Sequence, residues 1–415
     1  MVKIRDAHSL EGPLPDDGAS LLARVPAAQA VNGAQRVAAA LDAVLAAYPA
    51  EEDAAHRRER IGAALDILET LATLGLDADA LCAGVLCVPV AEGRIGAEAL
   101  ADGFGAGVAA LIAGVQRMDA LGLDPHEHTR RHSFANRQRQ GENLRRMLVS
   151  MIDDPRVALV KLAERVQALR ALGTGNDSSG AVQTARAAMD IYAPLAHRLG
   201  VGQIKWELED LAFRHLQPGD YRGIAKLLDE RRADREQFIA EATARLREAL
   251  AAAGVKAELS GRPKHLYSIW RKMQRKGIGI TEVYDVRALR VLVGSVADCY
   301  STLGIVHGLW RNLPGEFDDY IANPKPNGYR SLHTAVIGDG GRVLEVQIRT
   351  GDMHQEAELG ICAHWLYKSG EPVPAGRDYE DKIGWLRQVL GWGGELDAGE
   401  LISEHLRREV GAERV

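Results

Sequence analysis

The stretch Gly261-Arg-Pro-Lys-His-Leu-Tyr-Ser-Ile-Trp-Arg-Lys-Met-Gln-Arg-Lys276 carries six basic residues and no acidic one, in a chain whose net charge is −6. Past its proline it predicts a helix whose apolar face consists of Leu266, Ile269, Trp270 and Met273. Polar residues recur every fourth position along another side, at Lys264, Ser268, Lys272 and Lys276. A cationic ridge on an acidic protein favours a polyphosphate ligand. Nucleic acid and a merely solvated helix face are the alternatives.

Two different patterns meet at this stretch. Before it, Ala-rich helical runs occur at Val37–Ala47, Arg58–Leu74, Gly107–Ala120, Gly141–Met151 and Arg156–Leu172, and a long helix is predicted at about Tyr221–Ala253. Residues 173–180 are typical of a flexible linker. After it, strands are predicted at Val283–Val293, Tyr329–Ile337 and Val343–Arg349, with a helix at about Ala297–Arg311.

The 415 residues allow two or three domains of roughly 100–200 residues each. We predict an irregular segment at 1–30, an all-α domain at 31–200, a second domain of α+β or mixed α/β type at 201–377, and a C-terminal helix and tail at 378–415. The chain is therefore predicted to be a multidomain protein.

Composition narrows the class of protein. The chain is 46% hydrophobic and 26% charged, as is usual for globular proteins. Its four cysteines form no C-x-x-C pair, so disulfides and structural zinc are not expected. The N-terminus lacks the apolar core of a signal peptide, and no run of about eighteen apolar residues could span a membrane. We expect a cytoplasmic location and no membrane partner.

Polar residues alternate with apolar ones along the strand Val343–Arg349. Leu344, Val346 and Ile348 share one side, and Glu345, Gln347 and Arg349 share the other. Either a polar ligand or bulk solvent explains such a face. Tyr329, Ser331 and His333 likewise share a side of their predicted strand, after a proline-stiffened loop that presents Lys325 and Asn327.

Two acidic residues are candidates for a metal site. Asp285 opens one predicted strand and Glu345 lies on another. Carboxylates that converge from neighbouring strands are a common way of holding Mg²⁺, although a lone acid at a strand edge more often maintains solubility.

Five spaced motifs carry a family resemblance: G-R-P-K-H-x-Y-S-I-W-R-K-M, Y-D-V-R-A-x-R, E-F-D-D-Y, N-P-K-P-N-G-Y-x-S-x-H-T and E-V-Q-I-R-T, followed by A-H-W. In this order, from about Gly261 to Gly370, they resemble the synthetase domain of the RelA/SpoT family, the (p)ppGpp synthetases of the bacterial stringent response. The resemblance implies a nucleotidyltransferase-like fold with a mixed sheet flanked by helices. It also implies transfer of the β,γ-pyrophosphate of ATP to the 3′-hydroxyl of GDP or GTP, with release of AMP.

The resemblance also implies roles for individual residues. The ATP phosphates would be held by Arg262, Lys264, Ser268 and Lys272, with Arg262 able to stack on adenine as well. Mg²⁺ would be held by Asp285 and Glu345, and Glu345 would also act as general base. Tyr329 would stack on guanine, while the acceptor nucleotide would be fixed by Lys325, Asn327, His333 and Gln347. An ordinary strand histidine is the alternative for His333.

One of these five motifs is acidic at Glu316-Phe-Asp-Asp319. It resembles the version of synthetase-only members of the family, whereas bifunctional members carry a basic R-x-K-D there. Such a loop could recruit additional Mg²⁺ or favour GDP. A charged surface turn is the alternative.

In the family, the N-terminal helical domain is an HD-type Mn²⁺ hydrolase with an H-D-x-x-E-D signature. Here Cys87 and Val88 stand in the His-Asp position, and Pro89 is expected to break the helix. The segment K-L-A-D-R-x-H-N corresponds to Lys161–Ala168 and ends in Gln167 and Ala168. His126, His128 and His132 are expected in an exposed loop. We therefore predict a pseudo-hydrolase domain, because these residues cannot supply the ligands that Mn²⁺ needs.

Two functional hypotheses remain: a Mg²⁺-dependent GTP/GDP pyrophosphokinase, and a non-catalytic nucleotide-sensing or RNA-associated module. The presence of both Asp285 and Glu345 favours the enzyme, because binding alone needs no general base. The family resemblance implies that ribosome and tRNA contacts belong to C-terminal regions beyond these 415 residues.

Overall fold

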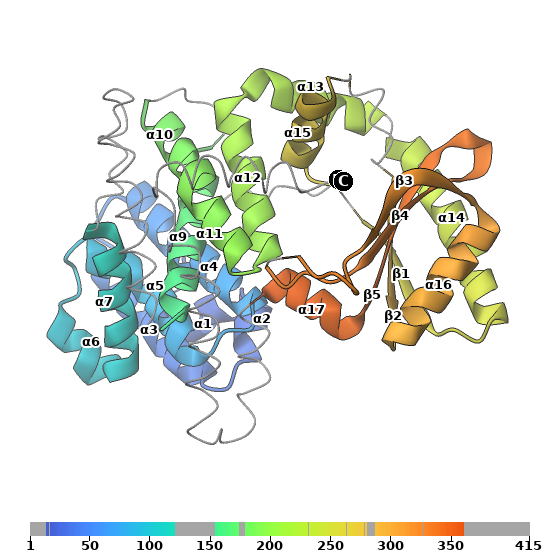
Figure 1. Cartoon of the computed structure of the whole chain (residues 1–415). Helices are drawn as coiled ribbons and strands as arrows, with labels where there is room; N and C mark the ends of the chain where they lie inside the picture. The colour runs from blue at the N-terminus through green and yellow to red at the C-terminus, as the bar shows by residue number, and fades with distance from the viewer. Residues whose placement is uncertain are drawn as a thin grey trace, which may run out of the picture. The chain divides into compact units, whose positions relative to one another are not determined.

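The computed structural model describes residues 14–15, 17–120, 154–173, 179–230, 232–262, 264–277, 279, 287–325 and 327–360. These residues form two compact units, which divide between Ala188 and Met189 (Figure 1). Asp285, the expected histidine loop at 126–132, and the predicted helices at 141–151 and 378–392 lie outside the described residues.

In the residues that the structure describes, all regular structure of the N-terminal unit is helical. Its helices are α1 (Gly18–Leu22), α2 (Pro26–Gln29), α3 (Ala34–Ala47), α4 (Ala54–Thr73), α5 (Ala78–Ala91), α6 (Ala97–Phe104), α7 (Ala106–Ala120), α9 (Arg156–Ala171) and α10 (Ser179–Ala187). The predicted runs within α3, α4, α7 and α9 are thereby confirmed. Helix α5 is the most buried element and contacts α3, α4, α7 and α9, as expected of a helix that is apolar on every side.

Pro89 does not break α5, contrary to the sequence prediction. Proline lacks the N–H that would bond to the carbonyl of Val85, but α5 ends only two residues later, at Ala91. The Pro89 carbonyl in turn accepts a hydrogen bond from the Arg94 backbone N–H (2.9 Å), which closes the helix end.

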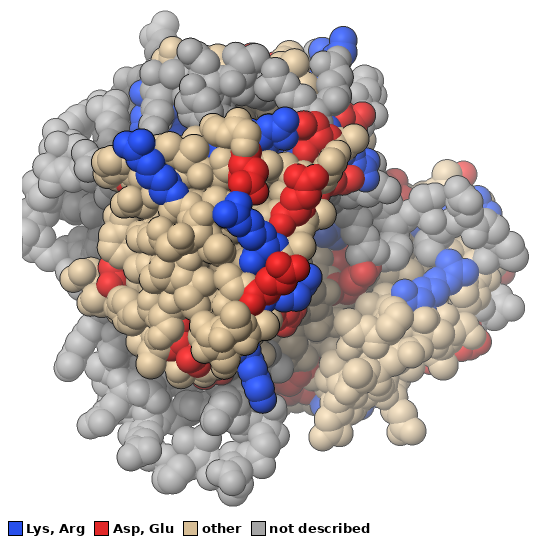
Figure 2. Space-filling view, turned by 90° about the vertical axis from the view of Figure 1, so that its right-hand side faces the viewer, with Lys and Arg blue, Asp and Glu red and all other residues tan. Residues whose placement is uncertain are grey.

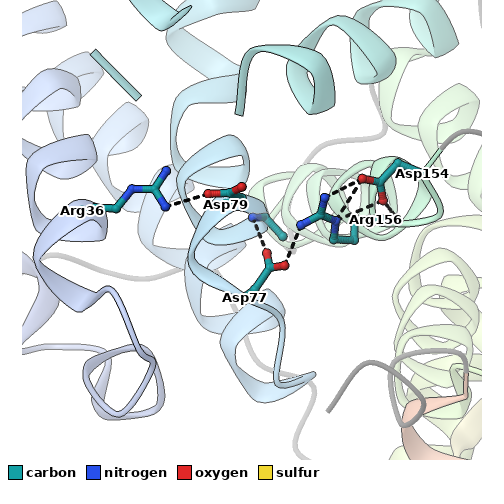
Figure 3. A network of polar contacts seen from close by, with 6 residues as sticks. Arg36, Asp77, Asp79, Asp154 and Arg156 are labelled. Carbon is teal, nitrogen blue, oxygen red and sulfur yellow. Dashed lines mark hydrogen bonds and ion pairs between the residues drawn. The ribbon is translucent and has the colours of Figure 1, made fainter. Parts of the chain in front are cut away.

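Charged residues join three helices of this unit (Figure 3). Asp77 caps α5 by accepting from the Ala80 N–H (3.0 Å), and it also accepts from Arg156 Nη1 at the start of α9 (2.6 Å). Arg36 on α3 pairs with Asp79 at 2.8 Å. The carboxylates thus stabilise the positive end of α5 and hold α3 and α9 to it.

The C-terminal unit combines helices with one five-stranded sheet. It contains η2 (Ala188–Tyr192), α11 (Ala193–Arg198), α12 (Gly202–Leu216), α13 (Pro218–Glu230), α14 (Arg232–Ala252), β1 (Ala257–Gly261), α15 (Leu266–Lys276), β2 (Ala288–Val293), α16 (Val296–Leu309), β3 (Arg311–Asp319), β4 (Leu332–Ile337), η5 (Asp339–Gly341), β5 (Val343–Thr350) and α17 (Gly351–Leu359). The strand order is β1-β2-β5-β4-β3. Only the β2–β5 pair is parallel, so the sheet is mixed, as expected.

One face of this sheet is apolar and packs on α14 and α16 (Figure 1). Leu344, Val346 and Ile348 of β5 are fully buried there against side chains such as Leu246 and Val306. A second, smaller core joins α12, α13 and α15 through Phe213, Ile224, Leu228, Leu266 and Ile269.

The prediction of a single long helix at about 221–253 is wrong. Its residues form α13 and α14, which belong to different cores: Ile224 and Leu228 pack against α12 and α15, whereas Phe238 and Leu246 pack against the sheet. No glycine or proline separates the two helices, so the local sequence carries no stop signal there.

Candidate functional site

The polar face of the sheet is the candidate site. In the strand register Gln347 of β5 lies between Arg290 of β2 and His333 of β4. Residues directly opposite in a sheet point to the same face, so all three share the face opposite α14 and α16. The alternation predicted for β5 is confirmed, and its polar residues are buried: Glu345, Gln347 and Arg349 are only 3%, 2% and 1% exposed. Bulk solvent therefore does not explain these polar side chains.

Glu345 is held by two neighbours. Gln347 Nε2 donates a hydrogen bond to Glu345 Oε1 at 2.7 Å, and Arg262 Nη1 lies 3.7 Å from the same oxygen. Arg262 directly follows β1, and its backbone N–H bonds to the Ala288 carbonyl (2.8 Å). The structure therefore brings together a predicted base, a predicted acceptor-binding residue and a predicted ATP-binding residue.

The loop before β4 brings together another group of the predicted residues. Tyr329 Oη and His333 Nε2 are 2.8 Å apart, and the two rings meet edge to face at 5.7 Å. Lys325 Nζ lies 5.7 Å from the centre of the Tyr329 ring. Asn327 accepts from the Tyr329 backbone N–H at 3.2 Å and so shapes the loop.

The strand predicted at 329–337 begins only at Leu332, which leaves Tyr329 in the loop. His333 is buried, and burial lowers the pKa of its imidazole well below its ordinary value, with further lowering by Arg262 and Lys325. Its ring is therefore neutral at pH 7.

The remaining predicted ATP-binding residues lie on or before α15. Ser268 and Lys272 are one turn apart on this helix, whereas Lys264 precedes it. The sequence predicted that Lys264 is the first of a row of polar side chains, one every fourth residue, along this helix. That is wrong for Lys264, because the helix begins only at Leu266. Lys264 is nevertheless one of the cations that lower the pKa of His333.

Arg290 and Arg349 belong to the same face, although neither was assigned to the site from the sequence. Arg349 Nη2 and Arg290 Nη2 both approach Glu358 Oε1 of α17, at 3.1 and 3.3 Å. Arg349 Nη2 also donates to His354 Nδ1 at 2.7 Å. The alternation of polar and apolar residues in both strands was the signal that could have identified the two arginines.

Four buried polar atoms on this face have no hydrogen-bond partner among the described residues. They are Glu345 Oε2, His333 Nδ1, Arg290 Nε and Arg349 Nε. Buried polar atoms are normally paired, so this concentration is typical of a site for a polar ligand.

The acidic motif Glu316–Asp319 lies within strand β3, not in a loop or turn. Asp319 accepts hydrogen bonds from the N–H groups of Ile321 (3.0 Å) and Ala322 (2.8 Å) and from Tyr300 Oη (2.9 Å). It therefore closes the turn that follows the strand. Asp318 lies opposite His333 in the register, so it shares the polar face.

In the helical unit, Cys87 of α5 is buried and its thiol donates to the Gly84 carbonyl (3.1 Å). Burial raises the pKa of this thiol well above its ordinary value. Lys161 of α9 is 1% exposed and pairs with Glu164 (2.8 Å) and Asp119. Within the described ranges, no group of three or more His, Cys, Asp or Glu side chains is arranged to hold a metal ion.

Surface charge bears on the nucleic-acid alternative. On the side shown in Figure 2, acidic and basic side chains are interspersed and form no large basic patch. Ion pairs such as Arg245–Asp339 (2.6 Å) and Arg232–Glu236 (2.9 Å) belong to α14 and its surroundings.

In the part of the chain that the structure describes, no helix is long and apolar enough to cross a membrane.

Two family models match the chain. Residues 261–372 match the region found in RelA / SpoT proteins, and residues 34–202 match an HD domain. A GTP pyrophosphokinase of Escherichia coli (strain K12) is 48% identical over 354 residues, which cover 85% of this chain and 47% of that protein. A GTP pyrophosphokinase of Streptomyces coelicolor is 42% identical over 366 residues, covering 85% of this chain and 42% of the relative. The chain thus spans about half the length of the curated relatives it matches.

The solved structures that are similar to this chain include small alarmone synthetase 1 from Bacillus subtilis bound to its product pppGpp. The similarity has 24% sequence identity and a TM-score of 0.29, and it covers 45% of this chain and 100% of that one. The sequence matches carry the assignment: this chain belongs to the RelA/SpoT family, with an HD-type region ahead of the region found in RelA / SpoT proteins.

Proposed function

We propose that the chain transfers the β,γ-pyrophosphate of ATP to the 3′-hydroxyl of GDP or GTP, making (p)ppGpp and releasing AMP. The observation that carries this proposal is the buried Glu345 carboxylate. One of its oxygens is held by Gln347 (2.7 Å), while the other has no partner among the described residues. A carboxylate that is fixed in this way, with one oxygen available, suits the removal of a proton from a hydroxyl group.

Cationic side chains beside Glu345 and along α15 support a polyphosphate substrate. Arg262 lies beside the carboxylate, and Lys264, Ser268 and Lys272 follow on the way into and along α15. Transfer between phosphate oxygens depends mainly on positioning and on offsetting negative charge. We assign the ATP phosphates to these four residues.

The acceptor nucleotide is assigned to the loop before β4 and to the adjacent strands. Tyr329 offers an aromatic face for guanine, and Lys325 and Asn327 lie in the same loop. His333 Nδ1 is a buried atom without a partner in the described residues, and neutral imidazole can donate or accept a hydrogen bond there. Gln347 lies between His333 and Glu345, so it can fix the acceptor close to the base.

The Glu345 carboxylate fits a Mg²⁺ site. Glu345 Oε2 is a hard, unpaired oxygen of the kind that Mg²⁺ prefers, and Asp285, three positions before β2, is the proposed second ligand. Bound Mg²⁺ would offset the charge of the phosphates. When no Mg²⁺ is bound, the guanidinium of Arg262, 3.7 Å away, partly offsets the negative charge of the Glu345 carboxylate.

The test is to incubate the chain with ATP, GDP or GTP, and Mg²⁺, and to separate the nucleotides by ion-exchange chromatography. We expect AMP and a 3′-pyrophosphorylated guanosine nucleotide in equal amounts. ATP binding without any AMP would favour the non-catalytic nucleotide-sensing alternative. Parallel reactions with the two acceptors measure the preference for GDP or GTP.

We further propose that the HD-type region does not hydrolyse (p)ppGpp. Cys87 and Val88 stand where the family's His-Asp pair is expected, and a protonated, buried thiol is a poor ligand for Mn²⁺. The two carboxylates nearest Lys161 are already paired with its ammonium group. The chain with Mn²⁺ and ppGpp should release no pyrophosphate above a protein-free control, and appreciable release would contradict this proposal.

A further inference from the structure

Helix α15 has no N-terminal cap of its own. His265 occupies the cap position, and its side chain makes no capping hydrogen bond. The missing acceptor comes from α12: Asp210 Oδ1 accepts from the Tyr267 backbone N–H at 2.8 Å, over 57 residues of sequence. Asp210 is only 2% exposed, so this is a buried carboxylate at the positive end of a helix.

The second oxygen of Asp210 holds the cap residue itself. Asp210 Oδ2 lies 3.0 Å from His265 Nδ1. One carboxylate therefore fixes both a backbone N–H of the first turn and the side chain that precedes it. A buried carboxylate with two such partners has little freedom to rotate.

Trp206 completes the contact one turn earlier on α12. Its ring stacks on the His265 ring, with centroids 5.0 Å apart and planes 21° apart. The guanidinium carbon of Arg262 lies 5.8 Å from the centre of the same Trp206 ring. Trp206 and Asp210 are four residues apart, so both lie on one side of α12.

We propose that Asp210 and Trp206 are positioning residues that hold the segment Arg262–Ser268 in the conformation that binds ATP. The inference rests on the proposed function, which assigns Arg262, Lys264 and Ser268 to the ATP phosphates. Neither α12 residue is assigned a contact with substrate. They act through His265, which directly follows Lys264, and Tyr267, which directly precedes Ser268.

The same contact decides how phosphate can bind at α15. A free helix N-terminus attracts phosphate through its N–H groups. Here the Tyr267 N–H is already bonded to the Asp210 carboxylate, whose negative charge opposes an anion at that place. Phosphate is therefore directed to the side chains of the segment and away from the N–H of Tyr267.

The test compares Asp210→Ala and Asp210→Asn with Asp220→Ala. Asp220 of α13 accepts from Trp270 Nε1 at 2.8 Å, so its loss removes another carboxylate contact of α15 but leaves the cap that Asp210 provides at Tyr267 intact. We expect Asp210→Ala to raise the KM for ATP about fivefold, the effect of losing one capping interaction of typical strength. The KM for GDP should change less than about twofold, within the usual scatter for independent sites.

Asp210→Asn retains an oxygen acceptor for the Tyr267 N–H, so it should recover most of the affinity for ATP. Trp206→Phe should likewise be milder than Trp206→Ala, because phenylalanine still stacks on His265. Asp220→Ala should leave both KM values near those of the unaltered chain. Equal loss of ATP and GDP affinity in Asp210→Ala, or the same loss in Asp220→Ala, would reduce the role of Asp210 to general stability and overturn the inference.

Calorimetric binding of a non-hydrolysable ATP analogue separates this inference from the proposed function. If the unaltered chain binds the analogue but forms no AMP, the proposed reaction fails, and the positioning role is judged on the analogue's affinity for the same variants. A loss of about fivefold confined to Asp210→Ala and Trp206→Ala supports it. Unchanged affinity in all of them overturns it, and so does failure of the unaltered chain to bind the analogue.

Discussion

Glu345 and Gln347 point from alternate positions of β5 to the same face of the sheet, and the amide of Gln347 donates a 2.7 Å hydrogen bond to Glu345 Oε1. The bond holds one carboxylate oxygen, while the other, Oε2, has no hydrogen-bond partner among the described residues. Both side chains are almost completely buried, so each orients the other within a site from which bulk water is largely excluded.

Glu345→Gln should abolish turnover and leave ATP binding intact. The amide has nearly the same shape but cannot remove a proton, so the rate of AMP formation should fall by roughly 10²–10⁴-fold. Turnover is measured as AMP release, and binding by calorimetry with a non-hydrolysable ATP analogue. Glu258→Gln, a substitution on the edge strand β1, is the control and should retain full activity. Retained turnover in Glu345→Gln would show that another group is the base.

Loss of the Glu358 carboxylate should destabilise the unit more than loss of its neighbour Glu356. Glu358 approaches both Arg349 and Arg290, and the Arg349 side chain is only 2% exposed. Glu358→Gln leaves a buried guanidinium without its anion, and we expect the free energy of unfolding to fall by about 2 kcal/mol.

Glu356→Gln is a matched control on the same helix. Glu356 pairs with Arg330 at 2.6 Å, but both side chains are more than a third exposed. Such a pair contributes less than about 1 kcal/mol. Urea unfolding monitored by tryptophan fluorescence measures both variants, and equal effects would contradict the buried role of Arg349.

The sequence predicted the parts of the site that depend on local periodicity. The alternation in Val343–Arg349 and the apolar face of α15 are both confirmed, because burial on one side of an element imposes its period on the residues. The edge strands β1 and β3 were missed, since edge strands are largely exposed and show little apolar alternation.

Contacts between distant segments could not be predicted in this way. Asp210 is one of several acids on an ordinary amphipathic helix, and its partner Tyr267 lies 57 residues further along the chain. The shared binding of Arg290 and Arg349 to Glu358 also depends on where α17 packs, which no local pattern encodes. The pairing of Asp285 with Glu345 stays a prediction.

Gly360→Ala should be strongly destabilising. Gly360 has φ 52° and ψ −127°, a conformation that is essentially reserved for glycine, and a Cβ there would overlap the Leu199 carbonyl oxygen. We expect a loss of about 3 kcal/mol in the free energy of unfolding. Gly254→Ala is the control: its φ is also positive, at 74°, but no atom lies within 4 Å of the added Cβ, so the expected loss is about 1 kcal/mol. Equal losses in thermal or urea unfolding would show that the approach to Leu199 is unimportant.

His354 should make the stability of the C-terminal unit depend on pH. Burial, together with the positive charges of Arg349 and Arg290, lowers the pKa of His354 from 6.5 to about 4. Its Nδ1 accepts the hydrogen bond of Arg349 Nη2 (2.7 Å), which only a ring unprotonated at that nitrogen can do. Between pH 6.5 and about 4 the unfolded chain therefore binds more protons at this residue than the folded chain.

The stabilisation from neutral His354 is consequently complete above pH 6.5 and is lost as the pH falls toward 4. His354→Asn keeps a side-chain acceptor but has no group that titrates in this range. We expect the free energy of unfolding of the variant to fall less steeply than that of the unaltered chain between pH 6.5 and 4, as measured by urea unfolding at a series of pH values. Parallel curves for the two proteins would mean that His354 is protonated with equal ease in the folded and unfolded chain, and the bond from Arg349 would then not control its titration.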